Sequence, residues 1–191
     1  MRLIDYFKEK KGFIFTKDIR SNRQLLYDLH DMVQTGEVVQ IKRGLYKHPQ
    51  YIQANHWQEV SLIYPKAVIY LFSAFAVYNL STYMPSRLHL AISRKSKLTI
   101  TPYMPAKLHY IHENYFQKHI NNTNGVNVFN LERTVCDAVK QERQIGTDIM
   151  TEVVKNYLKR KDMNLDKLSK TSREINMASK VNHIINIMIT L

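Results

Sequence analysis

The side chains best suited to chemistry in this sequence stand at the start of one amphipathic segment. Arg, Asn and Gln are the residues that match guanine or adenine edges, and Asn22, Arg23 and Gln24 occur in succession, with Tyr27 on the same face. The opposite face is an apolar stripe at helical spacing, formed by Leu25, Leu26, Leu29, Met32 and Val33. This pattern predicts a surface helix whose first turns read bases in the major groove of DNA. The acids Asp28 and Asp31 confine that contact to the first turn or two.

The elements that would position this helix are predicted in order by apolar spacing, cap residues and glycines. They are a helix that starts near residue 3 and ends before Gly12, an extended piece over 13–15, a short helix over 17–20 capped by Thr16, the longer helix begun by a capping box of Ser21 and Gln24, and two strands over 38–41 and 45–47 joined by a turn at 42–44. This order is typical of a winged helix-turn-helix, which we place over residues 1–50.

Basic residues near this helix and in the hairpin are candidates for contacts with DNA phosphates. They are Lys17, Lys42, Arg43 and Lys47, and Ser21 stands beside them at the start of the helix. A second basic group lies further along the chain and comprises Arg87, Arg94, Lys95 and Lys97. Two alternatives stay open: the hairpin is a structural or protein-binding wing, and the turn 94–97 is a solvated loop.

Charge and composition define the class of protein. The 191 residues include 28 Lys and Arg against 16 Asp and Glu, a net charge of +12, which favours polyanionic partners. A single Cys excludes an internal disulfide framework. We find no signal-peptide pattern, and the longest apolar stretch is too short to span a membrane. We therefore expect a cytoplasmic protein with no membrane partner. Residues 1–50 carry a net charge of only +4, so we expect the rest of the chain to face DNA phosphates as well.

The remaining chain, residues 51–191, reads as a mixed α/β domain that ends in helices, so the whole protein is predicted to be α+β. We expect a connector helix over 58–63, a helix over 73–79, strands over 87–92, 107–112 and 126–129, and a loop over 121–125. Asn130 is predicted to cap a helix over 131–139, on whose surface Arg133 and Asp137 would pair. Two further helices follow, the last capped by Asn164 with one apolar stripe from Leu165 to Met188.

Catalytic signatures are missing from the pattern. There is no phosphate-binding loop and no pair of carboxylates spaced to hold a divalent metal. His109, His112 and Glu113 form the one compact His/acid cluster, but positions 109 and 112 of a strand point to opposite faces. Cys136 is predicted to be a buried, inert thiol. We therefore expect no enzyme, no metal and no cofactor; the alternative is a nucleic-acid-processing enzyme that depends on His109 or Glu113.

Three segments, in order, carry a family resemblance. They are Arg43-Gly-Leu-Tyr46, Ser73-Ala-Phe-Ala-Val-Tyr-Asn-Leu80, and the run from Val126 to Asp137 that contains Leu-Glu-Arg-Thr-Val-Cys-Asp. Together they resemble the AbiEi antitoxins of abortive-infection toxin–antitoxin systems, although Asn130 stands where the family more often has Asp. The resemblance covers nearly the whole chain.

The AbiEi resemblance implies a function in bacterial phage defence. The winged helix would repress the shared promoter by binding inverted repeats, and a C-terminal antitoxin domain over 51–191 would neutralise the toxin. The genetic partner would be a nucleotidyltransferase-type toxin that forms no stable complex with the antitoxin. The run Glu132, Arg133, Thr134 and Asp137 would have a structural role. The alternative is a protein-interaction module whose wing binds the toxin directly.

Overall fold

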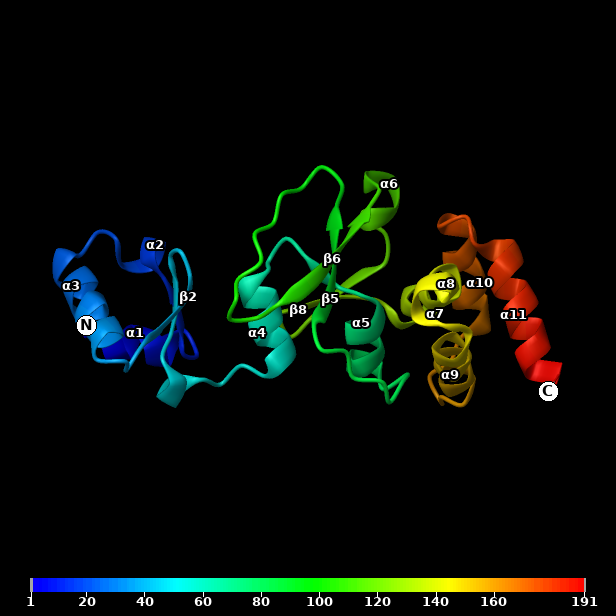
Figure 1. The fold of residues 1–191 in the computed structure, drawn as a ribbon, viewed down its shortest axis with the longest axis horizontal. Helices are drawn as coiled ribbons and strands as arrows, with labels where there is room; N and C mark the ends of the chain where they lie inside the picture. Colours follow the sequence, from blue (N-terminus) through cyan, green and yellow to red (C-terminus); the bar gives the residue numbers. More distant parts are fainter. Residues whose placement is uncertain (1, 191) are drawn as a thin grey trace. The chain divides into compact units, whose positions relative to one another are not determined.

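The computed structural model describes residues 2–190 and has the expected mixed α+β fold (Figure 1). The chain divides into two units: Met1–Ile63 with Thr99–Met104, and Tyr64–Leu98 with Pro105–Leu191. The first unit thus continues beyond residue 50, where the sequence suggested a boundary, and takes in a short segment from the middle of the chain. Within residues 2–190, no helix has both the length and the apolar character needed to cross a membrane.

The first unit contains the elements predicted from the sequence. They are α1 (Leu3–Glu9), β1 (Phe13–Phe15), α2 (Thr16–Ile19), α3 (Arg23–Gln34), β2 (Val39–Lys42) and β3 (Leu45–Lys47), followed by a 3-10 turn (Pro49–Tyr51) and α4 (His56–Ile63). The strands form an antiparallel sheet in the order β1-β3-β2, with Phe15 opposite Leu45 and Val39 opposite Lys47. The helices bury their apolar stripes in one core, formed by Leu3, Phe7, Ile14, Ile19, Leu25, Leu29 and Val38.

Two predicted helix caps are wrong. The residue that caps α3 is Asn22, whose side-chain oxygen accepts from the backbone N–H of Leu25 at 3.3 Å, whereas Ser21 lies one position too early. The residue before α2 is Phe15, and Thr16 is already helical. In both cases the apolar stripe located the helix, but the end depends on which residue leaves the helical backbone conformation, and neighbouring polar residues compete for that position.

Two features tie the first unit together. Gly12 has φ +88°, and a Cβ there would lie 2.8 Å from backbone atoms of Tyr51 and Ile52, so only glycine fits. The segment Thr99–Met104 joins the unit through side chains: Thr101 Oγ1 donates to the carbonyl of Ile41 at 2.6 Å. A fragment that ends near residue 66 would therefore lose contacts that belong to this unit.

The second unit is built on a five-stranded sheet in the order β6-β5-β4-β8-β7. The strands are β4 (Val68–Ile69), β5 (Leu88–Ser93), β6 (Ala106–Ile111), β7 (Ile120–Thr123) and β8 (Val126–Phe129), with β5–β6 and β4–β8 parallel and the other pairs antiparallel. The helices are α5 (Leu71–Tyr78), α6 (Glu113–Phe116), α7 (Leu131–Lys140), α8 (Glu142–Ile145), α9 (Thr147–Leu158), α10 (Leu165–Glu174) and α11 (Ala178–Thr190).

Two predictions for this unit are wrong. Residues 121–123 of the expected loop belong to β7 (Ile120–Thr123), in which Asn121 pairs with Val128, and the turn is confined to Asn124 and Gly125 at positive φ. Polar asparagines conceal an edge strand because its side chains face water. The expected long C-terminal helix is two helices, since Asn176 adopts φ +58° and ends α10 before α11 begins.

Helix α7 lies at the centre of the second unit's helical part. It packs against α5, α9, α10 and α11 (Figure 1), and its residues from Leu131 to Val139 are all buried. A helix with packed neighbours on every side must bury its polar residues along with its apolar ones. Those polar residues therefore need partners inside the protein.

Candidate nucleic-acid interface and buried polar centre

The polar face of α3 is exposed to solvent. Arg23 and Gln24 are exposed, and Tyr27 has 72% of its surface accessible. The Gln24 side-chain amide donates to Asp28 Oδ1 at 2.8 Å, one turn further on. Lys17, Ser21 and Asn22 are also exposed, but the side-chain oxygen of Asn22 is occupied by the cap. The residues that the sequence proposed for reading bases are thus brought together on one turn and a half of helix.

A shallow hollow of about 500 Å³ runs along this face. It is lined by Arg23, Leu26, Tyr27 and His30. His30 was not among the residues proposed from the sequence, although its i+3 relation to Tyr27 places it on the same face. The hollow combines a guanidinium, an aromatic ring and an imidazole, which are groups that contact bases and sugars.

The hairpin contributes one outward cation rather than three. Arg43 is exposed at the turn, as proposed. Lys47, in contrast, forms an ion pair with Glu59 Oε1 at 2.6 Å and is only 12% exposed. Burial lowers the pKa of Lys47, but the hydrogen bonds to Glu59 and Tyr103 outweigh that effect and the pKa is raised overall. Lys47 thus joins β3 to α4 and to the segment 99–104, and we withdraw its assignment to a phosphate contact.

Lys42 is also engaged inside the first unit, so we no longer assign it to a phosphate contact. Its ammonium donates to the carbonyl of Ile63 at the end of α4, and its side chain is half-buried. Burial lowers the pKa of Lys42 below the usual lysine value. Alternation along β2 did not reveal this because α4, which supplies the acceptor, lies 21 residues away in the sequence. The second basic group is exposed throughout and comprises Arg87, Arg94, Lys95 and Lys97.

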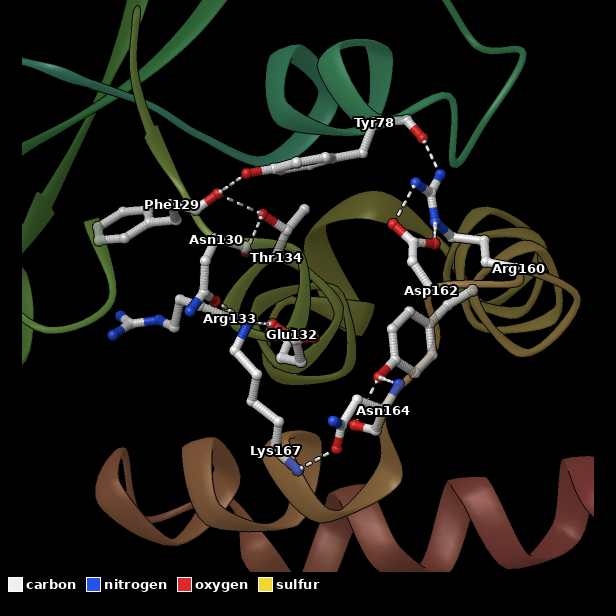
Figure 2. Close-up of polar contacts among 11 residues, drawn as sticks. Tyr78, Phe129, Asn130, Glu132, Arg133, Thr134, Arg160, Asp162, Asn164 and Lys167 are labelled. Atoms are coloured by element: carbon white, nitrogen blue, oxygen red, sulfur yellow. Dashed lines mark hydrogen bonds and ion pairs between the residues drawn. The ribbon is translucent and has the colours of Figure 1, made fainter. Parts of the chain in front are cut away.

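The family-like run forms a buried polar centre around the start of α7 (Figure 2). Asn130 caps the helix as predicted: its side-chain oxygen accepts from the Arg133 N–H at 2.8 Å. Thr134 Oγ1 donates to the Asn130 carbonyl at 2.9 Å, and the Tyr78 hydroxyl of α5 donates to the Phe129 carbonyl at 2.8 Å. Figure 2 shows these groups above the first turn of α7, where they satisfy the carbonyls that lead into the helix.

Ion pairs complete this centre. Glu132 is 2% exposed and bonds Lys167 of α10 at 2.8 Å (Figure 2). Arg133 Nε lies 2.8 Å from Asp137 Oδ2, so the predicted pair exists, but both side chains are 1% exposed and the predicted surface location is wrong. Burial raises the pKa of Asp137, and the positive charge of Arg133 opposes that rise. Arg133 also stacks on Phe129, with 4.7 Å from its guanidinium carbon to the ring centroid.

The other candidate residues are held apart from one another. His109 Nε2 lies 3.1 Å from His89 Nδ1, and burial lowers the pKa of both rings to about 4, with nearby positive charge adding to the effect. Glu113 instead accepts from Ser93 Oγ, and His112 is exposed. Cys136 is buried, and burial raises the pKa of its thiol. Among residues 2–190, no three His, Cys, Asp or Glu side chains are grouped so that they could hold a metal ion.

Comparisons with known proteins bear on the fold. The structure is similar to the crystal structure of the RV2827C protein from Mycobacterium tuberculosis, with a TM-score of 0.57 and 10% sequence identity, over 97% of this chain and 80% of that one. No family model matches the sequence. No curated protein matches it either. At this identity the likeness extends to the α+β fold across nearly the whole chain, and function must be argued from the residues.

Proposed function

We propose that the first unit is a winged helix-turn-helix that binds double-stranded DNA through the start of α3. The observation that carries this proposal is the exposed cluster of Arg23, Gln24 and Tyr27 on a helix whose opposite face is buried in the core. Side chains that donate and accept hydrogen bonds, held on a rigid helix and left open to solvent, are the requirement for reading base edges.

Each exposed residue has a distinct role in this proposal. Arg23 contacts a guanine edge in the major groove, and Gln24 contacts an adjacent base once its bond to Asp28 is exchanged for one to DNA. Tyr27 supplies apolar area against a thymine methyl group or a sugar. Arg43 and Lys17 bind phosphates on either side, and the net charge of +12 attracts the duplex as a whole.

We further propose that the protein is an AbiEi-type antitoxin that represses its own operon in the bacterial cytoplasm. This part is supported by the run from Val126 to Asp137, which resembles that family. The DNA partner is then the operon promoter with its inverted repeats, and the genetic partner is a nucleotidyltransferase-type toxin without a stable complex. Because the run is buried around α7, its residues would maintain the antitoxin unit and leave any contact with other molecules to its surface.

The DNA-binding proposal is tested by mobility shifts with the DNA upstream of the protein's own gene. Arg23→Ala should cost about 1–3 kcal/mol at one base position, whereas Arg43→Ala should weaken all sequences alike and lower the salt slope by about one. Arg143→Ala, an exposed arginine of α8, is the matched control. Binding that is indifferent to both Arg23→Ala and Arg43→Ala would refute the proposal.

The antitoxin proposal is tested separately. The adjacent open reading frame should encode a nucleotidyltransferase, and co-expression of this chain should restore growth to cells that express it. A neighbour of another class, or growth arrest that persists, would contradict the proposal. A stoichiometric complex on co-purification would favour the protein-interaction module instead.

A further inference from the structure

A pocket of about 260 Å³ lies within the second unit, beside the last turns of α7 and the end of β6. The proposed DNA contact of α3 leaves this pocket unused. Its lining brings together tyrosines, cations and one buried acid: Tyr70, Arg94, Tyr110, Ile111, His112, Tyr115, Arg133, Asp137, Lys140 and Gln141. None of these elements belongs to the first unit.

The buried acid is incompletely bonded. Arg133 Nε donates to Asp137 Oδ2 at 2.8 Å, but Asp137 Oδ1 is buried without a hydrogen-bond partner among residues 2–190. A carboxylate oxygen removed from water and left unbonded is costly. Asp137 is one of the residues that line the pocket, so a ligand that places an N–H donor against this carboxylate, with a small shift of the side chain, would satisfy Oδ1.

The rim of the pocket is positively charged. Arg94, just after β5, and Lys140, the last residue of α7, are both exposed. Lys140 Nζ lies 5.7 Å from the centroid of the Tyr115 ring, so its charge stands over the wall of the pocket. A negatively charged group on the ligand would find two cationic donors here.

The walls are aromatic. Tyr110 is 57% exposed and offers its ring at the opening. Tyr70 is buried, and its hydroxyl is hydrogen-bonded to the Gln141 side chain, which holds that amide at the pocket. Tyr115 is positioned by Asn176, whose amide donates to its hydroxyl at 2.8 Å. Planar walls of this kind favour a planar ligand that can stack on a tyrosine.

We propose that this pocket binds one nucleotide, with the base stacked between tyrosines, an N–H of the base donating to Asp137 Oδ1, and the phosphate held by Arg94 and Lys140. A free nucleoside monophosphate and a nucleotide of a single strand share this chemistry. Inorganic phosphate alone lacks the ring and the N–H donor and would engage only the rim, and an organic cation is repelled by the rim. A volume just under the usual 300 Å³ for ligand sites suits one base and excludes a dinucleotide cofactor.

The test is calorimetric titration of the full-length protein with AMP, CMP, GMP and UMP, and with the matching nucleosides and inorganic phosphate as comparisons. At least one monophosphate should bind saturably, and its nucleoside and phosphate alone should bind about tenfold more weakly or not at all. Arg94→Ala and Lys140→Ala should each weaken binding about tenfold, and Tyr110→Ala should weaken it as well. Arg143→Ala, on the neighbouring α8, is the control and should bind like the wild type.

Short single-stranded oligonucleotides, titrated into Arg23→Ala protein so that the contribution of α3 is reduced, show whether the bound nucleotide belongs to a strand. Sensitivity to Arg94→Ala and Lys140→Ala in that background supports the proposal with a nucleic-acid strand as the ligand. All five variants change exposed side chains, so they are expected to fold, and their melting temperatures verify this. The proposal is overturned if neither monophosphates nor oligonucleotides bind, or if binding ignores both rim substitutions. This outcome is independent of whether α3 binds DNA.

Discussion

Helices α3 and α7 begin with the same kind of cap but lie in opposite environments. Each has an asparagine cap that accepts from a backbone N–H three residues on, at 3.3 Å for Asn22 and 2.8 Å for Asn130. Each then carries an arginine in its first turn, but Arg23 is exposed whereas Arg133 is 1% exposed. The difference arises because α3 packs on one side only, while α7 has α5, α9, α10 and α11 around it. Thus the same local pattern stands on a solvent-exposed surface in one unit and in the interior in the other.

The largest expected effect is on stability. Arg133→Met should lower the free energy of unfolding by about 3–5 kcal/mol, because Asp137 would be left buried and charged without its partner. Arg23→Met should change it by less than about 0.5 kcal/mol. Urea unfolding of both variants measures this. Equal effects would mean that α7 is not an interior helix. The double variant Arg133→Met/Asp137→Leu should recover much of the loss, since neither charge remains.

A second difference concerns pH. The folded pKa of His89 and His109 is about 4, below the unfolded value near 6.5, so their neutral forms favour the native state. The contribution of these two rings to stability is therefore fully present above pH 6.5 and is lost as the pH drops toward 4, by on the order of a few kcal/mol for the hydrogen-bonded pair. His109→Gln should flatten that fall in unfolding curves recorded from pH 7 to 4.

The two caps offer a smaller and closely matched comparison. Asn130→Ala should cost about 1–2 kcal/mol and Asn22→Ala about 0.5–1 kcal/mol, because the buried N–H at residue 133 has no water to replace its acceptor. Thermal unfolding of the two single variants provides the measurement. A greater loss of stability for Asn22→Ala than for Asn130→Ala would contradict the view that the cap of α7 is the more deeply buried one.

The smallest effect is expected within α3 itself. Gln24→Ala removes an exposed bond to Asp28 and should cost only about 0.2–0.5 kcal/mol. The same change should weaken DNA binding by more than that if Gln24 reads a base. Stability and mobility-shift measurements on one preparation compare the two quantities, and a loss of stability without a loss of binding would leave Gln24 a purely local role.

Much of the fold could be predicted because most elements are encoded locally. Apolar spacing located α1, α3, α7 and α9, and alternation located β5, β6 and β8. The edge strand β7 escaped because its asparagines look like a loop, and the break at Asn176 escaped because one apolar stripe continues through both α10 and α11. In the candidate interface, the sequence predicted the exposed start of α3. It also assigned Lys42 and Lys47 to DNA, although their ammonium groups bind the Ile63 carbonyl and the Glu59 carboxylate of α4.

The sequence by itself determined which residues can be helical, capped, charged or apolar, since those properties depend on side chains a few positions apart. It also determined that Arg133 and Asp137 would pair, because one turn of helix separates them. Only the tertiary structure decided which polar residues face water. Burial depends on segments distant in sequence that pack together, as when α10 brings Lys167 to Glu132 or when the end of β6 meets α7 around Asp137 Oδ1.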